Sequence, residues 1–213
     1  AELFAEVREA SARDPLTTCF TRKHALDMID GERQRAQRSH HPVTLVMFDL
    51  NQFKKINDRF GHLCGDAVLA SVGQRMSAVL RDSGATQIAV SRDEAERLRF
   101  WSGRKNAFPA SGRISPDYMC MDSTIPRKRL ADILLAIQQM EQKYGLRCAN
   151  VFHAGDGNLH PLILFDANDA DQLHRCEQFG AEILEKIDAL GGTVTGEHGV
   201  GIEKLSSMCV QFS

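Results

Sequence analysis

The sequence predicts an α+β fold, a ferredoxin-like split βαβ sandwich with extra helices. Its 213 residues, 43% of them hydrophobic, suffice for one large or two small domains with a core of their own. A strand-like run, a helix-spaced segment and a second strand-like run follow one another twice along the chain, which is the pattern of two βαβ units. The predicted units comprise residues 43–49, 65–81 and 86–90, and residues 118–123, 130–144 and 147–153.

The N-terminal elements are predicted from apolar spacing. Residues 1–13 carry an apolar stripe at helical spacing and end at Asp14-Pro15, and a second helix is expected over residues 22–38. The continuous apolar run 43–48 follows Pro42 and ends at Asp49. We interpret this run as a buried strand that carries a carboxylate at its end.

The middle of the chain alternates helix and strand signals. Apolar residues recur every three or four positions over 65–81, and Gly84 follows them as a helix stop. Residues 86–90 are a short strand candidate, and Ser91 with Glu94 forms a capping box for a helix that runs to Trp101. These signals complete the first predicted βαβ unit and add one helix.

The second half has the clearest boundaries. A helix over 130–144 has Pro126 near its start and Gly145 after its end. Residues 147–153 and 159–165 are predicted strands, and a helix over 169–190 leads into the Gly-rich stretch 191–201.

Charge and cysteine content exclude several classes of protein. Lys and Arg number 26 against 28 Asp and Glu, so the net charge of -2 favours neither nucleic acid nor an anionic membrane as a partner. There is neither a signal peptide nor a long apolar span, and the six cysteines form no CxxC pair, which predicts reduced thiols. We therefore expect a cytoplasmic protein, with homo-oligomerisation left open.

Residues 14 to about 82 resemble the first half of a GGDEF domain, the diguanylate cyclase module that condenses two GTP molecules. The segments "DPLTTCFTR" and "FDLNQFKKINDRFGHLCGDAVL" carry the resemblance, and the predicted first domain is 1–82. The resemblance implies a Mg²⁺ carboxylate, two residues near the triphosphate and two guanine ligands, namely Asp49, Phe53 with Lys54, and Asn57 with Asp66. Alternatively, Asn57 and Asp66 only cap helices.

The Gly-Gly-Asp/Glu-Glu-Phe hairpin of that family is missing after Arg81. Phosphoryl transfer depends on positioning and charge neutralisation, so we expect no turnover of GTP and at most weak binding.

Residues 84–213 resemble the C-terminal domain of FAD-linked 2-hydroxyacid (glycolate) oxidases. The segments "DEAERLRFWSGRKNAFPASGRISPDY", "ANVFHAGDGNLHPLILFDAN" and "GGTVTGEHGVGIEKL" carry this resemblance, and the predicted second domain is 83–213. No segment matches the family's flavin domain or a GxGxxG fingerprint, so bound FAD is not expected. We interpret the chain as an engineered chimera joined near residues 82–85, with its two parts sharing one core; a natural fusion is the alternative.

A candidate metal site lies in "FHAGDGNLH". A two-residue turn at Asp156-Gly157 would place His153 directly opposite His160 on one face of a hairpin, and Glu197 would add a carboxylate. Two imidazoles and one carboxylate favour Zn²⁺, Fe²⁺ or Mn²⁺, although such histidines can instead be bonded to backbone.

The oxidase resemblance assigns the same three residues to the metal and implies that His198 is a general base. Arg104 could anchor a substrate carboxylate or serve in a surface ion pair. His24, His62 and His174 have no comparable sequence context and are interpreted as structural.

These observations predict a chimeric domain that keeps a divalent-metal site without complete catalytic machinery. Two alternatives are an oxidase fragment that needs a separate flavin domain and a GTP-binding remnant of a cyclase. A 2-hydroxy acid would be bound weakly if at all.

Overall fold

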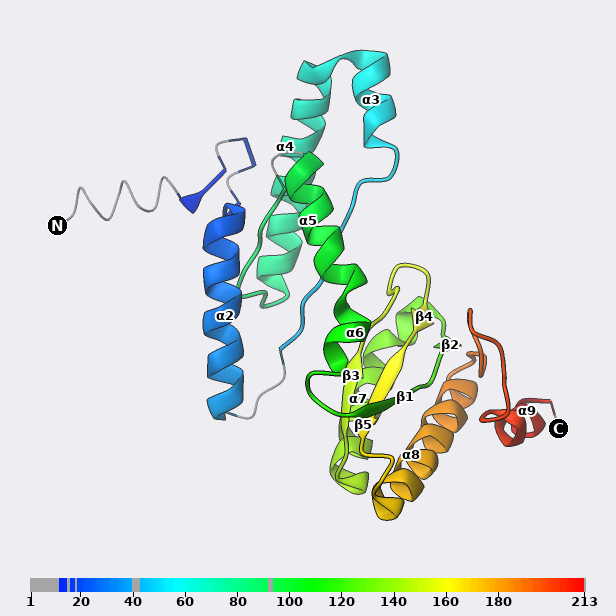
Figure 1. The fold of residues 1–213 in the computed structure, drawn as a ribbon. Coiled ribbons are helices and arrows are strands. Elements are labelled where there is room, and N and C mark those ends of the chain that lie inside the picture. The colour runs from blue at the N-terminus through cyan, green and yellow to red at the C-terminus, as the bar shows by residue number, and fades with distance from the viewer. Residues whose placement is uncertain (1–11, 15, 18, 40–42, 92–93, 213) are drawn as a thin grey trace. The chain divides into compact units, whose positions relative to one another are not determined.

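The computed structural model describes residues 12–14, 16–17, 19–39, 43–91 and 94–212. The chain divides into two compact units, Ala1–Arg104 (unit 1) and Lys105–Ser213 (unit 2). Figure 1 shows their elements along the chain. No helix among the described residues combines the length and the apolar character that a membrane crossing requires.

Unit 1 is helical. Its helices are α2 (Arg22–Ser39), α3 (Phe53–Phe60), α4 (His62–Asp82) and α5 (Glu94–Lys105), the last of which ends at the division between the units. The helices predicted over 22–38, 65–81 and the stretch to Trp101 are thus confirmed. The helix predicted over 1–13 falls almost wholly outside the described residues.

The buried strand predicted over residues 43–48 is wrong. The segment forms no regular structure, and all of its residues except the half-buried Met47 are exposed, with Leu45 at 72%. The strand predicted over 86–90 is reduced to one isolated bridge, between Ala89 and Phe20. A strand is stabilised by the hydrogen bonds and side-chain pairs of a neighbouring strand, and these two runs do not pair with each other. The first predicted βαβ unit therefore does not form.

The second predicted βαβ unit does form. In unit 2, β1 (Asp117–Cys120), β5 (Pro161–Phe165) and β3 (Arg147–Asn150) make a sheet in the order β1-β5-β3. Both pairs are antiparallel, so β1 and β3 are parallel and flank β5. Helix α7 (Leu130–Tyr144) connects β1 to β3 in the chain, which makes a split βαβ arrangement and confirms the α+β class.

The remaining elements of unit 2 are α8 and several shorter ones. They are α6 (Ala107–Ser111), β2 (Ser123–Thr124), a 3₁₀ turn (Arg127–Arg129), β4 (Asn158–Leu159), α8 (Ala170–Ala189) and α9 (Leu205–Gln211). β2 and β4 pair antiparallel as a second small sheet.

The core of unit 2 lies between helices α7 and α8 and the three-stranded sheet (Figure 1). Ile133 and Ile137 of α7, Phe179 and Ile183 of α8, and Ile163 of β5 are all at most 1% exposed. All five residues of β5 are buried, as expected for a central strand.

Local signals fix the ends of the two core helices. α7 ends at Gly145 in the left-handed conformation (φ 63°), where glycine has no steric penalty. The side chain of Asp169 accepts hydrogen bonds from the backbone N–H groups of Asp171 and Gln172 and so caps α8.

The division between compact units does not coincide with the predicted division by family resemblance. The structure divides the chain after Arg104, whereas the resemblances change near residue 82. Residues 83–104, predicted to belong to the oxidase-like part, lie in unit 1. The predicted family boundary and the shared core both stay predictions.

Candidate metal centre

The hairpin that carries the two histidines has a different register from the predicted one. His153 forms a bridge with Asn158, and the N–H of Val151 donates to the carbonyl of His160. The connection is therefore the four residues 154–157 and not a two-residue turn. Gly157 (φ 79°) closes it through a hydrogen bond from its N–H to the His153 carbonyl.

The predicted histidine pair survives this change. A shift of two residues keeps side chains on the same face of a strand, so His153 and His160 become diagonal neighbours. Their ring centroids lie 5.5 Å apart, with the planes at 84°. The face was predicted correctly, and the direct opposition of the two residues was wrong.

Glu197 reaches the same place from the Gly-rich loop after α8. One of its carboxylate oxygens lies 4.0 Å from Nε2 of His160. One ligand atom each from His153, His160 and Glu197 lies within 4.8 Å of the other two. His160 is 2% exposed, whereas His153 and Glu197 are exposed, so the set has one buried anchor and two ligands at the surface.

The residue that holds this arrangement together is Asp122, which the sequence analysis did not single out. It is 1% exposed. Its Oδ2 accepts hydrogen bonds from the backbone N–H groups of Gly196, Glu197 and His198 at 2.9, 2.8 and 2.8 Å. Its Oδ1 lies 3.3 Å from Nδ1 of His160. Asp122 thus binds the loop and lies beside the imidazole, although its Oδ1 and Nδ1 of His160 form no hydrogen bond. The available signal in the sequence was a carboxylate within an otherwise strand-like run.

The electrostatics of the anchor favour metal binding. Burial alone would raise the pKa of Asp122, but three backbone N–H donors and nearby Lys204 outweigh it and hold the pKa below its ordinary value. Burial lowers the pKa of His160 despite the opposing charge of Asp122. Neutral imidazole, the form that binds a metal, is therefore favoured, and a carboxylate at Nδ1 leaves Nε2 for the metal.

Lys204 is a second buried charge beside Asp122. It is 3% exposed, and its ammonium donates to the backbone carbonyl of Asp122. Burial lowers its pKa, while the charge of Asp122 acts in the opposite direction. The positive charge of Lys204 thereby offsets part of the negative charge that Asp122 brings into the interior.

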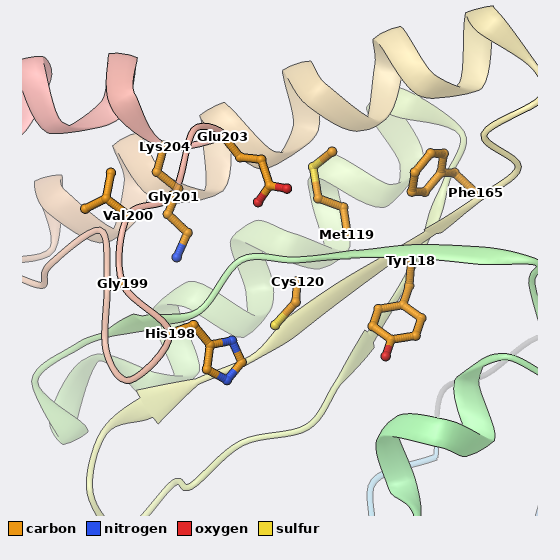
Figure 2. Close-up of a pocket in the computed structure, with 10 residues that line it drawn as sticks. All are labelled: Tyr118, Met119, Cys120, Phe165, His198, Gly199, Val200, Gly201, Glu203 and Lys204. Atoms are coloured by element: carbon orange, nitrogen blue, oxygen red, sulfur yellow. The ribbon is translucent and has the colours of Figure 1, made fainter.

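A pocket of about 370 Å³ adjoins this cluster. Figure 2 shows Cys120 and His198 near each other, with Tyr118 and Phe165 further along β1 and β5. The ring of His198 stacks on that of His160, with centroids 5.0 Å apart and planes at 14°. Burial, followed by the charge of Asp122, raises the pKa of Cys120 to about 11, so its thiol is protonated at neutral pH. His198, the predicted base, therefore lies beside the metal ligands and lines a pocket.

The residues predicted to bind GTP lie in unit 1. Phe53, Lys54 and Asn57 are in α3, and Asp66 is in α4. The Oδ1 atom of Asn57 is buried against Gly65, where a Cβ atom would lie 1.8 Å from it. This contact connects α3 to the start of α4, and the predicted guanine roles stay predictions.

The two remaining predicted residues also lie in unit 1. Asp49 follows the exposed 43–48 segment, and one of its carboxylate oxygens lies 3.7 Å from the guanidinium of Arg97. Its predicted role as a Mg²⁺ ligand is untested. Arg104 lies in α5, and its predicted role in binding a substrate carboxylate stays a prediction.

Fold and site together define the class of unit 2 as an α+β domain with a candidate metal centre. The chain belongs to the family "FAD linked oxidases, C-terminal domain", which matches residues 62–213. A second family, "Diguanylate cyclase, GGDEF domain", matches residues 11–94. Both predicted resemblances are confirmed, and the two matches overlap over residues 62–94, which include all of α4.

Similar proteins carry oxidoreductase names. Glycolate oxidase subunit GlcD of Escherichia coli K12 is 57% identical over 140 residues, which are 66% of this chain and 28% of that protein. The Bacillus subtilis protein of the same name is 38% identical over 128 residues, 60% of this chain and 27% of that protein. A probable mitochondrial D-lactate dehydrogenase of Danio rerio is 35% identical over 133 residues, 59% of this chain and 26% of that protein. The chain thus spans little more than a quarter of the length of these relatives.

Proposed function

We propose that unit 2 is a divalent-metal-binding domain of the FAD-linked 2-hydroxyacid oxidase type that has no turnover by itself. The observation that carries the proposal is the convergence of His153, His160 and Glu197 around a buried imidazole backed by Asp122. A histidine that binds a metal through one ring nitrogen usually has a carboxylate or a backbone carbonyl at the other ring nitrogen.

The donor set indicates which ions fit. Two imidazole nitrogens and one carboxylate suit Zn²⁺, Fe²⁺ or Mn²⁺, and Ca²⁺ prefers an all-oxygen shell. Three protein ligands leave coordination positions for water or a substrate oxygen, as in catalytic metal sites. The exposure of His153 and Glu197 keeps those positions accessible.

The pocket beside His198 suits a small 2-hydroxy acid in this proposal. Oxidation of such an acid removes the proton from the hydroxyl oxygen and a hydride from the carbon that bears this hydroxyl, and a C=O bond forms to give a 2-oxo acid. When bound, a metal would polarise the hydroxyl oxygen and a flavin would accept the hydride. His198 would take the proton, because neutral imidazole is a base near neutral pH and this ring lines the pocket next to the metal ligands.

Turnover in this proposal requires flavin from another polypeptide or domain. The family matched by residues 62–213 is a C-terminal domain, and the relatives are about four times as long as the matched segment. We therefore expect the chain of 213 residues to bind metal without oxidising glycolate or lactate.

Metal analysis tests the proposal directly. Elemental analysis for manganese and calorimetric titration with Mn²⁺ are applied to the parent protein and to His153→Ala, His160→Ala and Glu197→Ala. His174→Ala, an exposed histidine on α8, is the matched control. We expect metal binding in the parent and the control and its loss in the three variants; equal metal content in all five proteins would refute the site.

The overlapping family matches support a proposal about origin. Helix α4 lies within both matched ranges. We infer that the chain is an engineered chimera joined near residues 82–85, at the end of this helix. Incubation with GTP and Mg²⁺ tests its cyclase half: no cyclic dinucleotide is expected, and product that disappears in Asp49→Ala would contradict this.

A further inference from the structure

A second set of metal ligands shares His160 with the proposed centre. One ligand atom each from Cys120, His160 and His198 lies within 4.8 Å of the other two. We propose that this sulfur-containing set binds thiophilic ions, such as Cd²⁺ or Zn²⁺, in competition with metal at His153, His160 and Glu197. The binding stands independently of the proposed oxidase function, and only its inhibitory effect rests on that function.

The three residues come from separate parts of unit 2. Cys120 is the last residue of β1, His160 directly precedes β5, and His198 lies in the loop after α8. The pairing of β1 with β5 aligns Cys120 with Leu162, two residues from His160 on the neighbouring strand. Sheet register therefore fixes Cys120 and His160 as diagonal neighbours, and this part of the site is preformed.

His198 must turn before it can complete the set. Its ring now stacks on His160 with planes at 14°, and lone pairs in stacked rings do not converge on one ion. The side chain of His198 is exposed, so little packing opposes its rotation. Gly199 and Gly201, which follow it, both adopt positive φ values (80° and 57°). A short rotation of an exposed side chain is the structural change required.

The choice of ion follows from ligand chemistry. Thiolate sulfur favours Cd²⁺, Zn²⁺ and Cu⁺, whereas a carboxylate in its place favours harder ions such as Mn²⁺. Binding displaces the thiol proton of Cys120 to solvent and forms the metal–sulfur bond. The ammonium of Lys204 favours negative charge on this sulfur, while Asp122 opposes it.

The two sets cannot both be filled through one nitrogen of His160. In the first set that atom is Nε2, because Nδ1 faces Asp122. An ion held by Cys120 would also engage His198, the proposed base. Within the proposed function, soft ions would therefore act as inhibitors that remove both the hard metal and the base.

Cadmium titration of the full chain tests the inference. Cadmium bound to thiolate gives a charge-transfer absorption in the near ultraviolet, which reports sulfur ligation directly. We expect this absorption in the parent protein, its loss in Cys120→Ser and weaker binding in His198→Ala. Cys209→Ser is the matched control because Cys209 is the exposed free thiol of α9. Retention of the absorption in Cys120→Ser, or its loss in Cys209→Ser, would overturn the inference.

Two further measurements separate this inference from the proposed metal centre. Glu197→Ala should lose Mn²⁺ binding but keep the cadmium–thiolate absorption, because Glu197 belongs to the first set alone. In the parent, added Cd²⁺ should release bound Mn²⁺, as followed by electron paramagnetic resonance of free Mn²⁺. Absence of Mn²⁺ binding would refute the first centre only, and simultaneous binding of both ions would refute the competition.

Discussion

The two compact units contain helices of similar length but differ in what they bury. Helix α4 of unit 1 has 21 residues and α8 of unit 2 has 20. Among the described residues of unit 1, the buried hydrophobic side chains are Cys19 and Ala25, whereas unit 2 has a continuous apolar cluster from Met121 to Val194. Unit 1 instead buries polar groups such as Ser77, whose hydroxyl lies 3.1 Å from the Sγ atom of Cys19.

The difference shows what a sequence motif supplies and what it does not. Both units contain segments that match a known family, yet only unit 2 pairs its predicted strands. Apolar residues on a strand are buried only when a neighbouring strand and a covering helix are present. The core of unit 2 therefore supports a defined site, and substitutions in this core should cost more free energy of unfolding than substitutions at exposed positions of unit 1.

Among the substitutions considered, Phe179→Ala should lower the free energy of unfolding most. The ring is fully buried in α8 and stacks on Tyr144 with centroids 5.3 Å apart. We expect a loss of roughly 3–5 kcal/mol in the free energy of unfolding, from lost burial and the resulting cavity. Leu45→Ala in unit 1, at a 72% exposed site, should change it by about 0.5 kcal/mol or less. Urea unfolding measures both changes, and equal losses of free energy of unfolding in the two variants would contradict the difference between the units.

Asp122→Asn should weaken the metal centre more than it weakens the core. The amide keeps the size of the side chain but lacks the negative charge that lies 3.3 Å from Nδ1 of His160 and accepts hydrogen bonds from three N–H groups. We expect metal affinity to fall by roughly 10–100-fold in calorimetric titration. Asp171→Asn, at an exposed site on α8, should leave affinity unchanged. A parent-like affinity in Asp122→Asn would show that the linkage has no role in binding.

Gly196→Ala should disturb the same linkage through sterics alone. A Cβ atom there would lie 2.5 Å from Oδ1 of Asn158 and 2.9 Å from Oδ1 of Asp122. Both side chains are buried, so relief requires movement of the loop, and we expect a loss of about 1–3 kcal/mol in the free energy of unfolding. Gly155→Ala, with open space around it, is the control for differential scanning calorimetry. Equal melting temperatures for the two variants would count against this packing.

The smallest effect is expected at the surface of unit 2. Hydrogen bonds from Lys143 and Tyr144 hold the pKa of Glu182 below its ordinary value. A depressed carboxyl pKa adds stability above the unfolded pKa of about 4.3, and this stability is lost as pH falls toward the folded value. Glu182→Gln should therefore lower the urea midpoint slightly at pH 7. The difference from the parent should vanish in acid, and a difference that persists below pH 3 would contradict the assignment.

Much of unit 2 was predictable from sequence because local and tertiary signals agree there. Helix α7 has a proline near its start, an apolar stripe and a glycine after its end, and β5 is apolar throughout. The register of the histidine hairpin was not predictable. The N–H of Ile125, in a separate segment, donates to the carbonyl of Gly157, and this pairing draws Asn158 into β4. The prediction that His153 and His160 share one face of the hairpin was correct because a two-residue shift preserves the face of a strand.

Other features depended on information that one segment of sequence does not carry. The apolar run 43–48 looks the same whether or not a partner strand exists, so its exposure could not be foreseen. Asp122 becomes important only when the chain brings residues 196–198 back to it. Cys120 likewise gains a chemical context only through the pairing of β1 with β5.

The hydrogen bonds from the loop to Asp122 join residues that are 74 to 76 positions apart in the chain, and this separation affects the order of folding events. Closing so long a segment costs more entropy than forming the hairpin or either helix, whose contacts are local. During folding, the two imidazoles should therefore come together before the carboxylate of Glu197 arrives. A metal ion that encounters the chain early would meet an incomplete shell, and tight capture would mark the last stage of folding.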